Sequence, residues 1–146
     1  MEDIIQEKIS ADHLLYVSLK YTKTCDVMVN LLLRWSRMIE SSLDAILKKA
    51  LKNKKISEIP ENPLRKIETI KKLFKDNQNM QESIEAYKMF RKIKELKTER
   101  VGEFRKNVTL KVIYQGQEVQ INLDKLREYA DMLEKFISDT KQYLLS

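Results

Sequence analysis

The only histidine of the chain stands in a segment whose side chains could bind a phosphate or exchange a proton. His13, Tyr16 and Lys20 follow one another at three- and four-residue steps, so a helix places them on one face. An imidazole, a phenol and an amine in a row could act as acid and base or hold an anion. The alternative interpretation is that they border the core, with Tyr16 half-buried and Lys20 in water.

A second group of candidate residues lies between the predicted helical and β parts of the chain. Arg100, Arg105, Lys106 and the amide of Asn107 surround the aromatic Phe104. Guanidinium groups bind phosphate through paired hydrogen bonds, and an aromatic ring stacks on a base. The segment therefore suits an RNA or nucleotide site. The alternative is a hairpin base that carries ordinary surface charges.

Two arginines occur within the most apolar part of the chain. Arg34 and Arg37 flank Trp35, and a buried guanidinium must find a carboxylate, an aromatic face or a partner chain. Glu40 and Asp44 lie about one or two helical turns away and could pair with them. An ion pair between two subunits is the other solution, and the sequence leaves both open.

Most catalytic and metal-binding patterns are absent. The chain has no P-loop, no GxGxxG, no HExxH, no CxxC and no GxSxG, and two glycines cannot build a phosphate-cradling loop. One cysteine and one histidine exclude a four-ligand zinc site, so we expect neither a metal nor a cofactor. Cys25 falls on an apolar helix seam and is interpreted as a small buried hydrophobe.

The net charge of +6 is concentrated in one stretch. Residues 48–75 carry ten basic and three acidic groups, a balance of +7. Such a segment could attract phosphate backbones or an acidic protein, or it could be the solvated end of a helix. The candidate basic patch consists of Lys48, Lys49, Lys52, Lys54, Lys55, Lys71 and Lys72.

The longest periodic pattern predicts a long first helix. Apolar residues recur every three or four positions from Leu14 to Ile46, with Ser10 as the expected N-cap. Residues 11–53 in one helix would span roughly 65 Å, more than the diameter of a compact domain of this size. The helix must therefore break near residues 22–26, or project and pair with a second copy, which is the interpretation we favour. The candidate dimer interface is Leu31, Arg34, Trp35 and Met38.

The rest of the chain predicts shorter helices and one hairpin. A possible flexible link at 54–62 precedes a helix capped by Asn62 with Pro63 in its first turn. Asn79 and Glu82 resemble a capping box for the next helix, which ends near Gly102. Period-two alternation around Gln115 and Gly116 predicts a β-hairpin at about 108–122, before a last helix. The fold class is a mainly α, four-to-five-helix bundle in a single domain, residues 1–146.

The composition is typical of an intracellular protein. The longest uncharged run has seven residues, far below the roughly 20 that a membrane span requires. The start of the chain lacks the basic and apolar segments of a secretory signal. We expect a cytoplasmic protein with no membrane contact.

The segment from His13 to Thr22, together with the arginine-rich stretch after the third helix, resembles HEPN proteins (higher eukaryote and prokaryote nucleotide-binding). The resemblance implies a helical bundle that dimerises and, in many members, a ribonuclease of toxin–antitoxin systems. Its active motif is an arginine, four to six residues and then a histidine. Here Arg100 is followed after six residues by Asn107. The resemblance therefore implies a member that lacks the imidazole for proton transfer but retains RNA or nucleotide binding.

Two functional hypotheses follow. The first is a non-enzymatic, homodimeric binding or scaffold protein whose basic surface binds RNA, a nucleotide or an acidic protein partner. The alternative is a HEPN-like ribonuclease or toxin–antitoxin component with a degenerate active site, in which His13 would assist the Arg100–Asn107 segment.

Overall fold

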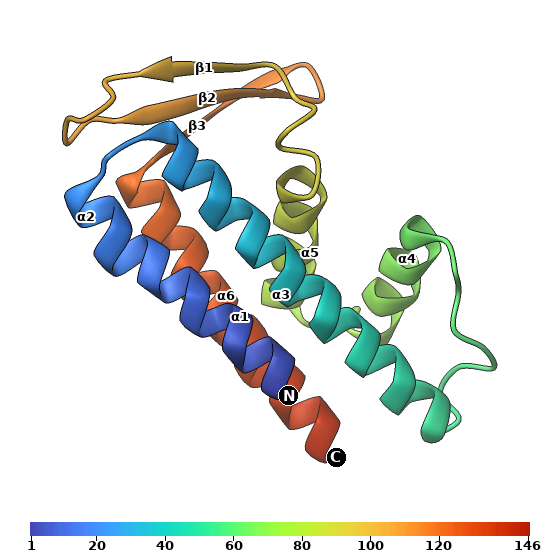
Figure 1. Ribbon diagram of the computed structural model, residues 1–146. Helices are drawn as coiled ribbons and strands as arrows, with labels where there is room; N and C mark the ends of the chain where they lie inside the picture. The colour runs from blue at the N-terminus through green and yellow to red at the C-terminus, as the bar shows by residue number, and fades with distance from the viewer.

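The computed structural model describes all residues 1–146 and shows a mainly helical protein with a small sheet before the last helix (Figure 1). The predicted fold class is therefore confirmed. The helices and strands follow in this order: α1 (Glu2–His13), a π-helical segment (Leu14–Ser18), α2 (Leu19–Tyr21), α3 (Cys25–Lys52), α4 (Pro63–Leu73), α5 (Gln78–Phe90), β1 (Thr98–Val101), β2 (Thr109–Tyr114), β3 (Gln117–Asn122) and α6 (Leu123–Leu145).

The single rod predicted over residues 11–53 is wrong, because the chain turns back at residues 22–24. Thr22 (φ −130°, ψ 88°) and Thr24 (φ −115°, ψ 154°) leave the helical region of backbone space. The Thr24 hydroxyl accepts a hydrogen bond from the Val27 N–H and caps α3. The helix before the break begins at Glu2, so Ser10 lies inside α1 and is not its N-cap. The break falls where the alternative prediction placed it, and α1 runs back along α3 (Figure 1).

Helix α3 is the centre of the hydrophobic core, with α1, α4, α5, α6 and the sheet around it. The Trp35 ring lies 5.8 Å from Phe90 and 6.2 Å from Tyr129, between centroids. Leu31, Trp35 and Met38 are buried within one chain. The predicted dimer interface is therefore wrong for these three residues, since neighbouring elements already cover them. The fourth candidate, Arg34, stays at the surface.

The predicted hairpin is confirmed, and it is part of a three-stranded antiparallel sheet in the order β1-β2-β3. Gln115 (φ 52°) and Gly116 (φ 77°) both have the positive φ of a type I′ turn. Leu110, Val112 and Ile121 point into the core. The prediction that the helix of this segment ends near Gly102 is wrong, because α5 ends at Phe90 and residues Thr98–Val101 form the first strand. Its residues are almost all exposed, so no alternation of apolar side chains marks it as a strand.

The helix-capping predictions have mixed outcomes. Asn62 caps α4 by accepting from the Leu64 N–H at 2.8 Å, with Pro63 as the first helical residue, as predicted. The cap of α5 is Asn77, which accepts from the Met80 N–H, and not Asn79. Asn79 instead donates to the Met132 carbonyl of α6 at 3.0 Å. The predicted link at residues 54–62 contains neither helix nor strand.

None of the helices combines the length and the apolar character that a transmembrane span requires.

The central position of α3 makes a prediction about stability. Leu32 is fully buried, so Leu32→Ala should lower the free energy of unfolding by about 2–5 kcal/mol. Leu64→Ala on the exposed side of α4 is the control and should change it by less than about 1 kcal/mol. Urea denaturation followed by circular dichroism measures both, and equal effects would contradict the assignment of α3 as the core helix.

Candidate functional site

The structure places the predicted group of His13, Tyr16 and Lys20 at two separate hollows. All three side chains are exposed. His13 borders a groove between α1 and α3, whereas Tyr16 and Lys20 line a hollow against the start of α6. His13, Tyr16 and Lys20 therefore lie on the surface and do not form one site.

Arg100 of the second predicted cluster is held in ion pairs. Its Nη2 lies 2.6 Å from Asp26 Oδ1, and its Nη1 lies 3.4 Å from Glu103 Oε1. The same Glu103 oxygen accepts from the Cys25 N–H at 3.1 Å, at the amino end of α3. Pairing with Arg100 lowers the pKa of Asp26. Arg100 and Glu103 thus fasten the sheet to the first turn of α3.

The loop after Arg100 folds tightly and turns Phe104 toward solvent. Gly102 (φ +66°) packs so closely that a Cβ there would lie 2.8 Å from Asn107 Oδ1. Phe104 also has a positive φ, of 68°, and its N–H donates to the Lys23 carbonyl at 2.7 Å. The backbone of this loop is thereby docked on the α2–α3 turn. The Phe104 ring is left 74% exposed, and Arg105 is exposed beside it.

Two neighbouring hollows are lined by two residues of each predicted cluster, whereas Arg105 lines neither. One, of about 510 Å³, is lined by Lys106 and Asn107, and the other, of about 270 Å³, by Tyr16 and Lys20. They adjoin each other, since both are lined by Lys23, Leu123 and Arg127. We use the term end surface for these hollows and the two exposed rings next to them: Tyr16, Lys20, Tyr21, Lys23, Phe104, Lys106, Asn107 and Arg127.

The end surface carries an excess of positive charge. Lys20, Lys23, Lys106 and Arg127 line it, and the one carboxylate in its lining, Asp124, lies 3.2 Å from Arg127. Sequence reasoning missed Lys23 and Arg127, because they come from other elements that only the fold brings to this place. The hydrogen bond from Phe104 to Lys23 has no signal in the sequence.

The predicted basic patch is divided in the structure. Lys48, Lys49, Lys52, Lys54 and Lys55 lie at the carboxyl end of α3 and just beyond it. Helix α3 has 28 residues, so this end is about 40 Å from the end surface. On α4, Lys71 pairs with Glu85 of α5, and Lys72 is exposed.

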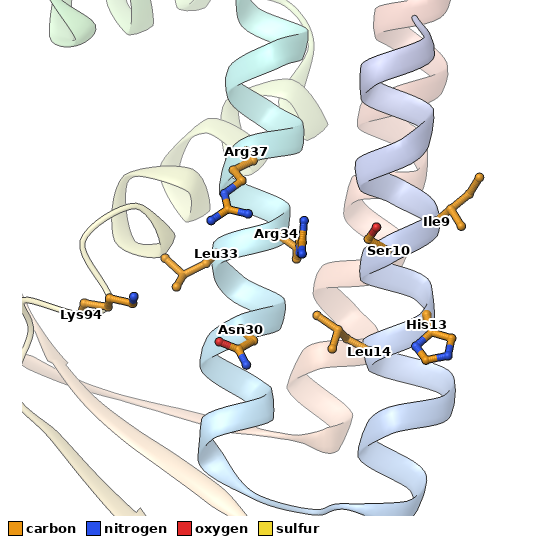
Figure 2. Close-up of a pocket in the computed structure, with 9 residues that line it drawn as sticks. All are labelled: Ile9, Ser10, His13, Leu14, Asn30, Leu33, Arg34, Arg37 and Lys94. Carbon is orange, nitrogen blue, oxygen red and sulfur yellow. The ribbon is translucent and has the colours of Figure 1, made fainter.

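A third hollow, of about 630 Å³, lies over the outer face of α3 (Figure 2). Figure 2 shows Ser10 and Leu14 pointing toward it from α1, and Lys94 reaching toward α3 from the segment after α5. Helix α3 contributes Asn30, Leu33, Arg34 and Arg37. We call this hollow the α3 groove. No carboxylate lines it.

The arginines of the α3 groove do not use the carboxylates that the sequence suggested. Glu40 accepts from the Tyr87 hydroxyl at 3.1 Å, and Asp44 pairs with Lys66 at 3.2 Å. Arg34 instead approaches Glu7 of α1, with 3.5 Å between Nη1 and Oε2. Neither Arg37 nor Lys94 makes an ion pair. The positive charge in the groove is therefore largely uncompensated.

Cys25 is buried, as predicted, at the first position of α3. Its Sγ lies 3.5 Å from the Thr109 carbonyl oxygen. Burial, and then the nearby charge of Glu103, raise the pKa of this thiol to about 11. The thiol is thus kept neutral, which fits a packing role and not a nucleophilic one.

Comparisons with protein families, with curated proteins and with solved structures find no match to this chain.

The raised pKa of Cys25 predicts how the free energy of unfolding depends on pH in alkaline solution. A cysteine with an ordinary pKa of 9.0 loses its proton in the unfolded chain before the folded protein does. The contribution of Cys25 to the free energy of unfolding should therefore stay constant below about pH 9 and be lost as pH rises toward 11. Urea denaturation midpoints measured from pH 8 to pH 11 should show this decline, and it should be shallower in Cys25→Ala. Identical pH profiles for the two proteins would contradict the prediction.

Proposed function

We propose that this protein binds single-stranded RNA at the end surface and does so without cleaving it. The observation that carries the proposal is a pair of adjoining basic hollows with three exposed aromatic rings in the same part of the surface. Tyr16 lines one hollow, Tyr21 follows the lining residue Lys20, and the Phe104 N–H donates to the carbonyl of the lining residue Lys23. Tyr16, Tyr21 and Phe104 are 56%, 78% and 74% exposed. Unpaired bases stack on such rings, and stacking is worth about 1–3 kcal/mol per base.

The charges of the end surface fit the phosphate backbone between stacked bases. Lys20 and Lys23 come from the α2 end, Lys106 from the loop before β2, and Arg127 from α6. Cations along a groove attract the backbone regardless of sequence. The Asn107 amide, at the rim, can hydrogen-bond a base edge. Aromatic rings among the cations favour RNA over an acidic protein, which would need the charges alone.

Binding without cleavage is favoured over a ribonuclease by the surroundings of two residues. Arg100 already faces Asp26 and Glu103. His13 borders the α3 groove, whereas Asn107 borders the end surface, so no imidazole lines the end surface within one chain. The ribonuclease alternative would require His13 of a second copy to reach Asn107.

The proposal predicts a specific loss of RNA affinity. Phe104→Ala should weaken binding of a single-stranded oligonucleotide about tenfold, because one stacking platform is lost. Lys106→Gln together with Arg127→Gln should weaken binding and lower the slope of log affinity against log salt by about 0.7 per phosphate contact. Fluorescence anisotropy at several salt concentrations measures both effects, with circular dichroism to confirm folding.

The matched control removes the same charge from the opposite end of α3. Lys48→Gln together with Lys52→Gln should leave the affinity within about twofold of the original. If this control loses affinity while the end-surface variants keep it, RNA binds at the predicted basic patch and the proposal is wrong. If the unaltered protein does not bind single-stranded RNA even at low salt, the proposal is also wrong.

We further propose that two copies associate through the outer side of α1. Met1, Ile5 and Ile9, spaced by four residues, form an exposed apolar stripe there, with Ile5 44% and Ile9 56% exposed. A second copy related by a twofold axis would cover this stripe with its own Met1, Ile5 and Ile9.

Self-association is tested by mass in solution. Sedimentation equilibrium at micromolar concentration should give a dimer, and Ile5→Asp with Ile9→Asp should give a monomer, because charges would be buried at the contact. Leu64→Asp, an exposed apolar position on α4, is the control and should stay dimeric. A monomer of the unaltered protein would contradict this second proposal and leave the RNA proposal standing.

A further inference from the structure

The α3 groove is a concentration of positive charge that the end surface does not use. None of its lining residues contributes to the end surface. We propose that the α3 groove is a second, independent binding site and that its ligand is a small phosphate monoester.

The charge of the groove matches a phosphate monoester. Arg34, Arg37 and Lys94 supply three positive charges, and the neighbouring carboxylate, Glu7, offsets one of them. The remaining two charges match a monoester dianion, which carries about −1.5 to −2 at neutral pH. A phosphodiester of an RNA backbone carries a single negative charge and matches less well.

Two of the cations lie on the same side of the hollow. The Arg37 guanidinium on α3 and the Lys94 ammonium from the segment after α5 point into the side of the hollow where Leu33 lies, whereas Arg34 is turned toward α1 (Figure 2). A guanidinium fork and an ammonium can together bind the terminal oxygens of a phosphate monoester.

Arg34 approaches Glu7 and still has donors that are not used by this contact. At 3.5 Å this contact is longer than an ordinary charge-assisted hydrogen bond. The buried Oε2 of Glu7 has no hydrogen-bond partner in the structure. The guanidinium has five N–H donors, so it can approach Glu7 and still donate to a ligand.

The size and lining of the groove indicate a ligand larger than phosphate alone. About 630 Å³ is within the usual range for small-molecule sites. Leu14 and Leu33 provide apolar surface, and Ser10 and Asn30 provide a hydroxyl and an amide. These groups suit the polar organic body of a monoester such as a sugar phosphate.

Isothermal titration calorimetry with ribose 5-phosphate, ribose and inorganic phosphate tests the inference. Ribose 5-phosphate should bind, ribose should not, and inorganic phosphate should bind at least tenfold more weakly than the ester. Arg37→Gln and Lys94→Gln should each weaken the binding of ribose 5-phosphate about tenfold, since each removes a charge-assisted hydrogen bond. The control Arg65→Gln, an exposed cation of α4 without an ion pair, should leave it unchanged.

Several results would overturn the proposal. Equal binding of ribose, or affinities in Arg37→Gln and Lys94→Gln equal to that of the control, would show that these cations bind no phosphate. Equal binding of inorganic phosphate would show a site for the free anion only. If ribose 5-phosphate fails to bind but a 5′-phosphorylated oligonucleotide binds in an Arg37-dependent way, the ligand is an RNA end and not a small molecule.

The two functional proposals fail separately. Lys106→Gln with Arg127→Gln should reduce RNA binding and leave the titration with ribose 5-phosphate unchanged. If that variant weakens both, the α3 groove is not an independent site. If RNA does not bind to any variant, only the proposal for the end surface is lost.

Discussion

The burial of α3 is the constraint on which the rest of the structure depends. Apolar side chains occur on several sides of this helix, and 13 of its 28 residues are buried, so one neighbouring helix cannot cover it. The preceding segment must therefore turn back and pack as α1, while α5, α6 and the sheet close the remaining sides. The turn at residues 22–24 is stabilised by the Thr24 cap and by Glu103 and Phe104 from the distant loop. Local capping and long-range contacts thus act at the same point of the chain.

The same turn explains how the end surface is formed. When α1 and α2 fold back, Tyr16 and Lys20 come close to the beginning of α6, and the loop that closes over the turn adds Lys106 and Asn107. The interactions of Arg100 and Glu103 hold the backbone of this region, so the neighbouring Phe104 ring and lysines can remain exposed without loosening the fold. Within this short segment, Arg100 and Glu103 contribute to stability, whereas Phe104 and Lys106 remain available for binding.

Periodic patterns predicted the elements well wherever an apolar face marks them. The presence of helices in the four predicted segments, the hairpin around Gln115 and Gly116, and the Asn62 cap follow from local side-chain chemistry, whereas the break at residues 22–24 and the end of α5 at Phe90 do not. The strand β1 could not be predicted in this way, because its side chains are exposed and only its hydrogen bonds to β2 define it. The partners of Arg34 and Arg100 were also beyond prediction, since Glu7 and Asp26 reach them only once α1 folds back and the sheet docks.

The π-helical segment Leu14–Ser18 has a consequence for how this chain could vary in length. A π-helical turn accommodates one residue more than an α-helical turn does. Deleting a single residue there would restore ordinary helical spacing and leave the faces of α1 and α2 in register, because the wider π turn already absorbs one extra residue. Ile4 and Ala11 would then stay in the interior. The same deletion within α1 itself would rotate the residues before it by about 100° relative to α2 and bring Ile4 to the surface. The π-helical segment is therefore the place in the first two helices where the loss of one residue is best tolerated.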